Sequence, residues 1–195
     1  MARPFDPGAK GAGESFRSIL PPTDVAWEET TMAKHAKDLK DLFHETLKDI
    51  YFAEKQILRA LPQMAKAAQS DERRQAFETH RDETESQIER LDQVFEIIGK
   101  SPQGKTCEAI IGIIDEGKEV MEDFAETDAL DPGLLAAAQA VEHYEISRYG
   151  TLKTWAQQLG LMEAVQLLDA TLAEEKKTDE LLTKLATASV NQKAA

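Results

Sequence analysis

Residues 36–68 read AKDLKDLFHETLKDIYFAEKQILRALPQMAKAA, without a glycine and with one proline, Pro62. Apolar residues recur here every three or four positions, which is the period of an amphipathic α-helix. From residue 23 to residue 98 the sequence contains no glycine and no second proline. So long a run without helix-breaking residues favours helices over a sheet. The apolar stripe of the quoted stretch consists of Leu39, Phe43, Leu47, Ile50, Ile57, Leu61 and Met64.

Four further segments have the same period, and each is bounded by glycine, proline or a capping residue. We expect helices over residues 36–68, 71–98, 106–124, 134–159 and 162–188, with Asp131-Pro132-Gly133 as a turn before the fourth. The first two and the last two helices have similar lengths and short connections, so each pair predicts an antiparallel hairpin. The pattern therefore predicts an all-α fold, a four-helix bundle of two hairpins joined by a crossover helix.

The first 22 residues differ from the rest, because they hold four of the seven prolines and three of the ten glycines. We expect a flexible N-terminal extension over residues 1–35, a bundle over 36–188 and a C-terminal tail over 189–195. Met32 also allows a translation start there, which would make the first 31 residues a misread extension.

The overall charge limits the partners of the protein. The 195 residues include 36 Asp or Glu and 23 Lys or Arg, a formal net charge of −13. This balance argues against nucleic acid and anionic membrane surfaces, since both require a dense basic face. The apolar runs are too short to span a bilayer, and we find no signal peptide. A single cysteine, Cys107, cannot form an internal disulfide, so we expect a cytoplasmic protein.

Polar residues interrupt the apolar stripes of all four long helices near mid-length. When the second hairpin is aligned on the first, Glu54 corresponds to Glu145, which indicates a weak internal duplication. The interruptions would then meet at one depth of the bundle. The interrupting residues that we select as candidate ligands are Glu54, His80, Glu83, Glu142, Glu145 and Glu175.

Several carboxylates at one level of an apolar core need neutralisation, because burying an unpaired anion costs several kcal/mol. Shared protons or basic side chains could supply it, but a carboxylate-rich shell with one imidazole suits iron or manganese better than zinc. We therefore expect two divalent transition-metal ions. Two alternatives stay open: a rotated bundle in which Glu54 and Glu145 form surface ion pairs, and a buried His80 bonded to a neighbouring glutamate. Weaker candidates are Glu174, Asp179 and Glu116.

Five short stretches carry a family resemblance. They are DIYFAEKQILRALPQMA at 49–65, FETH at 77–80, ETESQIERL at 83–91, EHYEI at 142–146 and LAEE at 172–175. Together they resemble the YciF-type (YciF/YciE) ferritin-like stress proteins, over roughly residues 36–188. The resemblance implies a rubrerythrin-like bundle, usually a homodimer, with a di-metal carboxylate centre and a role in bacterial stress. The match departs from typical di-iron bundles, because His80-x-x-Glu83 reverses the usual Glu-x-x-His order and the fifth helix has no histidine.

Two functional hypotheses follow from the residues and the resemblance. The first is a metal-binding protein that oxidises Fe(II) or consumes dioxygen or peroxide; we assign no catalytic residue beyond the metal ligands and no other cofactor. The second is a non-catalytic dimeric helical scaffold whose metal is structural or absent. Hydrolase and nucleotide-binding activities are not expected, because the sequence has neither a Gly-x-Ser-x-Gly elbow nor a phosphate-binding glycine loop.

Overall fold

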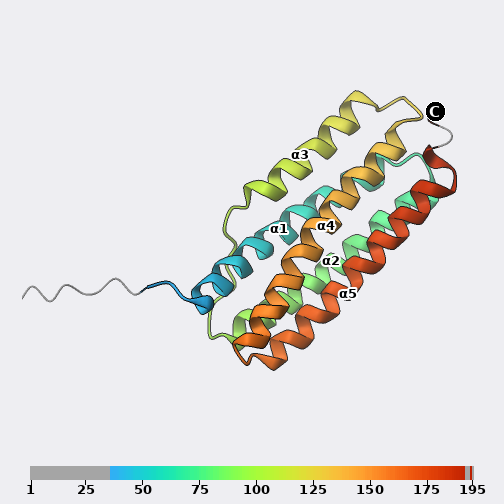
Figure 1. The fold of residues 1–195 in the computed structure, drawn as a ribbon. Coiled ribbons are helices and arrows are strands. Elements are labelled where there is room, and N and C mark those ends of the chain that lie inside the picture. Colours follow the sequence, from blue (N-terminus) through green and yellow to red (C-terminus); the bar gives the residue numbers. More distant parts are fainter. Residues whose placement is uncertain (1–35, 192–193, 195) are drawn as a thin grey trace, which may run out of the picture. The chain divides into compact units, whose positions relative to one another are not determined.

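Helices account for almost all of the chain that the computed structural model describes, which is residues 36–191 and Ala194 (Figure 1). This part of the chain contains no β-strand, so the predicted all-α class is confirmed. The predicted extension over residues 1–35 lies outside the described residues. The elements are α1 (Leu39–Ala67), α2 (Asp71–Ile97), α3 (Glu108–Asp123), α4 (Leu130–Gln158), α5 (Met162–Leu185) and a π-helical turn, η1 (Ala186–Val190).

The four long helices pack as two antiparallel hairpins (Figure 1). Helix α1 pairs with α2 and α4 pairs with α5, while α1 also contacts α4 and α2 also contacts α5. Helix α3 lies outside this bundle against α1 and α4. The predicted four-helix bundle with a crossover helix is confirmed, because α3 carries the chain from the end of α2 to the start of α4 at the opposite end.

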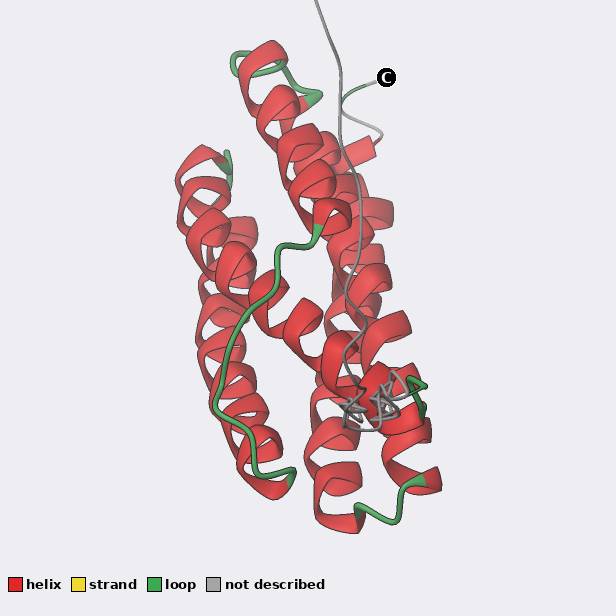
Figure 2. Cartoon of the chain, turned by 90° about the vertical axis from the view of Figure 1, so that its left-hand side faces the viewer, coloured by secondary structure: helices red, strands yellow, loops and turns green. Residues whose placement is uncertain are grey.

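A long irregular connection precedes the crossover helix, and Figure 2 shows it as the longest green loop along the bundle. Helix α2 ends at Ile97, and Gly99 follows it with a φ of 66°, a left-handed conformation that glycine adopts without strain. The loop is held against α1, because the backbone N–H of Lys105 donates to the carbonyl of Lys48 at 3.0 Å. This contact places the start of α3 beside α1.

Helix α4 begins earlier than predicted. It starts at Leu130, so the predicted Asp131-Pro132-Gly133 turn is wrong and these three residues form the first turn of the helix. Proline fits there because the first turn of a helix needs no hydrogen bond from its N–H. The carboxylate of Asp131 accepts hydrogen bonds from the Arg73 side chain and from the backbone N–H of Gln69.

The apolar stripe of α1 faces the core as predicted. Phe43, Leu47, Ile50, Ile57 and Leu61 are each at most 3% exposed. Burying a side chain of this size stabilises the fold by about 1.5–3 kcal/mol. None of the described helices is long and apolar enough to cross a membrane.

Candidate metal centre

Acidic residues and one histidine from all four bundle helices meet in the interior. Helix α1 supplies Glu54, α2 supplies His80, α4 supplies Glu142 and Glu145, and α5 supplies Glu175. The four glutamates are fully buried and His80 is 5% exposed. One ligand atom from each of His80, Glu142, Glu145 and Glu175 lies within 4.8 Å of the others. We call Glu54, His80, Glu142, Glu145 and Glu175 the interior cluster.

Helical spacing explains why these side chains point inward. Glu142 and Glu145 are three residues apart, so they lie on one face of α4 together with Val141, Tyr149 and Leu152, which are buried. On α1, Glu54 occupies the stripe between Ile50 and Ile57. The alternative that Glu54 and Glu145 form surface ion pairs is therefore wrong.

Glu54 occupies one side of the cluster and has a hydrogen-bond donor of its own. The phenolic hydroxyl of Tyr149 on α4 donates to Oε1 of Glu54, whereas Oε2 has no hydrogen-bond partner among the described residues. Burial raises the pKa of Glu54 well above its ordinary value, and the charge of Glu175 raises it further.

The other glutamates experience the same two effects. Burial is the larger cause of the raised pKa of Glu142, with Glu175 next, and of Glu145, with Glu54 next. Burial also raises the pKa of Glu175. In the opposite direction, burial lowers the pKa of His80 to about 4, because it disfavours the charged imidazolium. Without cations the cluster therefore favours neutral side chains.

The ligand atoms of the cluster are largely unpaired. Within the described part of the chain and with the carboxylates ionised, the atoms without a hydrogen-bond partner are both ring nitrogens of His80, both carboxylate oxygens of Glu142 and of Glu145, and Oε2 of Glu175. When protonated, Glu142 and Glu175 can share a hydrogen bond, and so can Glu54 and Glu145. Nε2 of His80 lies 3.2 Å from Oε1 of Glu142, without hydrogen-bond geometry. Buried polar atoms are normally paired. Oxygen and imidazole donors that converge without partners suit a divalent transition metal.

A second set of polar residues contacts the cluster from the α2 and α5 side. The Gln87 side-chain amide donates to Glu175 and to Glu174, and Arg90 forms a bidentate ion pair with Glu174. The sequence reasoning selected neither Gln87 nor Arg90. Their spacing offered a signal, because residues 80, 83, 87 and 90 recur at three- and four-residue intervals on one face of α2.

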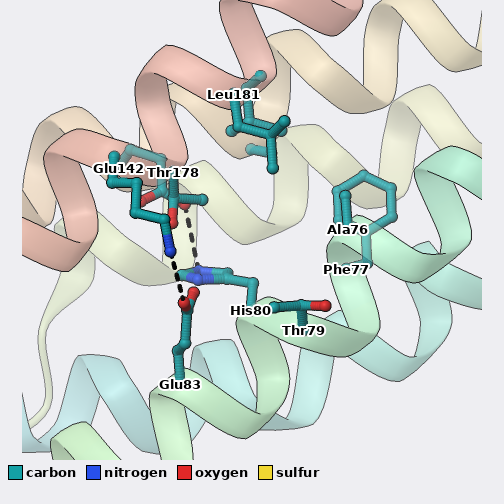
Figure 3. Close-up of a pocket in the computed structure, with 11 residues that line it drawn as sticks. Ala76, Phe77, Thr79, His80, Glu83, Glu142, Thr178 and Leu181 are labelled. Atoms are coloured by element: carbon teal, nitrogen blue, oxygen red, sulfur yellow. Dashed lines mark ion pairs between the residues drawn. The ribbon is translucent and has the colours of Figure 1, made fainter.

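Glu83 lies apart from the interior cluster. Its side chain is 25% exposed, and Oε1 lies 3.8 Å from Nζ of Lys177 on α5. Figure 3 shows this ion pair next to the contact between His80 and Glu142. Burial raises the pKa of the Glu83 carboxyl.

The structure places the weaker candidates outside the cluster. Glu174 faces Arg90, so Glu175 is the member of that adjacent pair that points inward. Asp179 contacts Gln139 and the exposed His143, and Glu116 is exposed on α3.

Comparisons with known proteins agree with this architecture. The family model described as "Domain of unknown function (DUF892)" matches residues 38–195. Protein YciF of Escherichia coli (strain K12) is 48% identical over 159 residues, which cover 81% of this chain and 96% of that protein.

Two solved structures have the same fold. The crystal structure of the E. coli stress protein YciF superimposes with a TM-score of 0.77 at 47% identity, covering 81% of this chain and all of that one. YcfI from Rhodopseudomonas palustris, whose description proposes a structural role, gives a TM-score of 0.74 at 44% identity, covering 77% and 96%.

Proposed function

The chain belongs to the family described as "Domain of unknown function (DUF892)", and from this premise we propose that it is a ferritin-like stress protein that binds two divalent transition-metal ions. Iron is the first choice and manganese the second. We further propose that the protein is a cytoplasmic homodimer that oxidises Fe(II) or consumes dioxygen or peroxide.

One observation carries the proposal: the interior cluster combines four buried glutamates with a buried histidine, and most of their ligand atoms are unpaired. Four ionised carboxylates carry four negative charges, which two divalent cations would balance. The nearby basic side chains do not neutralise these carboxylates. Arg90 pairs with Glu174, and Lys177 approaches Glu83 at the surface. The residues that would hold the ions are Glu54, His80, Glu142, Glu145 and Glu175.

The surrounding side chains prepare the cluster for this role. Tyr149 orients Glu54, and Gln87 orients Glu175, through the hydrogen bonds described above. The apolar residues above and below the cluster, such as Ile50, Ile57 and Leu152, exclude water from it. Iron or manganese would supply one-electron redox chemistry toward dioxygen or peroxide. The chain itself supplies the oxygen and nitrogen donors and a fixed spacing between them.

The test is the metal content per chain after anaerobic loading with Fe(II) or Mn(II), measured by elemental analysis. We expect about two ions per native chain, the number that two-metal sites hold. The double variant Glu142→Gln, Glu145→Gln keeps the side-chain volumes and should lose most of the metal. Glu116→Gln, on the exposed face of α3, is the matched control and should bind as the native chain does.

The second candidate function is a non-catalytic helical scaffold, which the proposed structural role of YcfI favours. A scaffold would keep its fold and its oligomeric state after chelation and show no redox turnover. Sedimentation velocity with and without chelator tests both this candidate and the proposed homodimer. If the native chain holds no metal after the loading procedure, the scaffold becomes the favoured function.

A further inference from the structure

A pocket of about 60 Å³ is lined by two residues of the interior cluster, His80 and Glu142 (Figure 3). Its walls come from α2, α4 and α5. At its inner end lie the buried His80 and Glu142, and at its outer end lie the exposed Lys177 and Leu181. A space of this size holds a few water molecules. The pocket therefore leads from the surface toward two of the candidate ligands, whose ligand atoms lie buried at its inner end.

Small side chains keep this path open. Ala76 on α2 and Ala138 on α4 line it where larger residues would fill the groove between the helices. The charged or titratable residues of the lining are His80, Glu83, Glu142 and Lys177.

Glu83 stands between the surface and the cluster. It follows His80 by three residues, so the two side chains share one side of α2. Its carboxylate lies 3.8 Å from Lys177, whose side chain is 79% exposed. So exposed an ion pair is weak, because water and salt screen it. An entering cation can therefore replace Lys177 at the carboxylate of Glu83.

Resting on the metal-binding function proposed above, we propose that this pocket is the entry route for divalent cations and that Glu83 transfers each entering cation to His80 and Glu142. Lys177 opposes entry, because its ammonium competes for the same carboxylate. Both ring nitrogens of His80 and both oxygens of Glu142 have no hydrogen-bond partner among the described residues, so acceptors for a cation lie at the inner end. The carboxylate of Glu83 would repel an anion from the same path.

The test is the rate of Co²⁺ uptake by the full chain, followed by stopped-flow visible absorption, with the final cobalt content measured separately. Glu83→Gln should slow uptake about tenfold, since a local charge changes association rates by this order. Lys177→Gln should accelerate uptake severalfold. Both variants should reach the native final content, because neither residue belongs to the interior cluster.

Lys153→Gln is the matched control. Lys153 pairs with Asp169 at 2.6 Å; its side chain is 30% exposed, and like Lys177 it carries a positive charge at the α4 and α5 side of the bundle. It lies 11 residues from Glu142 along α4, which is about 16 Å in a helix. The Lys153→Gln variant should take up Co²⁺ at the native rate. If it were accelerated as much as Lys177→Gln, the acceleration would come from the change in net charge alone, and the proposed route would be overturned.

The outcomes separate the route from the function. Equal uptake rates in all variants overturn the route and leave the metal site intact. A lower final cobalt content in Glu83→Gln overturns the transfer role, because Glu83 would then be a resident ligand. No cobalt in the native chain overturns the proposed function, and the route with it. Circular dichroism verifies the fold of each variant, and Lys177→Gln tests the route by itself if Glu83→Gln does not fold.

Discussion

Tyr149 on α4 donates its phenolic hydrogen bond to Oε1 of Glu54 on α1, and the exposed fraction of both side chains is zero. The bond joins the two hairpins inside the bundle, at the level of the interior cluster. It satisfies one oxygen of Glu54 and leaves the other without a partner among the described residues. Tyr149 is thus a positioning residue for Glu54.

Replacing Tyr149 by phenylalanine should destabilise the metal-free protein. The substitution keeps the ring and removes the donor, which leaves a buried carboxyl oxygen without its partner. A loss of this kind costs about 1–3 kcal/mol. Urea unfolding followed by circular dichroism measures the change in the free energy of unfolding.

Tyr144→Phe is the control for this prediction. Its hydroxyl also donates to a carboxylate, that of Asp49 at 2.9 Å, but at a partly exposed site where water can replace it. We expect a smaller loss than for Tyr149→Phe. Equal losses in the two variants would contradict a special role for the bond to Glu54.

The positions of the cluster residues could be predicted because helical period determines which side chains share a face. Glu54 lies between Ile50 and Ile57, and Glu145 lies between Val141 and Leu152, so the apolar neighbours alone predict their burial. Their metal-binding role stays a prediction. The helical period was less informative for Glu83. This residue shares a side of α2 with His80 but lies at the edge of that side. Only the rotation of α2 against α5, which depends on tertiary packing, places it beside Lys177.

The start of α4 was predicted wrongly for a related reason. Asp-Pro-Gly favours a turn when it is considered locally. In the folded chain, Asp131 is 3% exposed and binds Arg73 and Gln69 from the other hairpin. A contact between residues about 60 positions apart therefore decides a local boundary, and no single-sequence pattern reveals it.

Asp131→Ala should destabilise the protein strongly. The substitution removes the partner of Arg73, whose side chain is 14% exposed, and one acceptor of the α1 to α2 connection. Breaking a buried ion pair from one side costs about 3–5 kcal/mol. Thermal and urea unfolding measure the loss.

The matched variant is Asp71→Ala, which removes the partner of Arg74 in an exposed pair. Exposed pairs contribute about 0–1 kcal/mol, so this variant should unfold close to the native chain. If both variants behaved alike, the Asp131 contact would not stabilise the junction between the hairpins.

Gly133→Ala should also destabilise the protein, through the packing of α3 on α4. A Cβ at this position would lie 2.5 Å from Cγ1 of Val120, so the Val120 side chain or one of the two helices must shift. Overpacking of this kind costs about 1–3 kcal/mol.

Gly112→Ala on α3 is the opposite case, because its Cβ would meet no heavy atom of the described chain within 4 Å. It should stabilise the helix by about 0.5–1 kcal/mol, since alanine restricts the unfolded chain. Differential scanning calorimetry of both variants measures the two shifts.

The metal-free protein should lose stability as the pH rises from 6.5 to about 8.5. In the unfolded chain the glutamates ionise near their ordinary pKa of 4.5, whereas burial keeps the pKa of Glu54, Glu142 and Glu145 well above that value. The folded state then binds more protons than the unfolded state, so its stability falls with rising pH. Each retained proton contributes on the order of 1 kcal/mol per pH unit. Below pH 6.5 the buried His80 has the opposite effect on stability. Burial lowers its pKa, so the unfolded state binds this proton more readily and stability falls as the pH decreases.

Saturating Mn(II) should reverse this dependence. Cation binding requires ionised carboxylates, so it becomes more favourable as the pH rises and offsets the loss of the protons. At a hundredfold excess over its dissociation constant, a bound ion stabilises the folded state by about 2.7 kcal/mol. Urea unfolding at three pH values, with Mn(II) or with chelator, gives both slopes. Glu145→Gln removes one titrating group and should make the metal-free slope shallower. A metal-free stability that stays constant over this range would mean that the carboxylates are ionised and paired, which contradicts an interior cluster that needs cations.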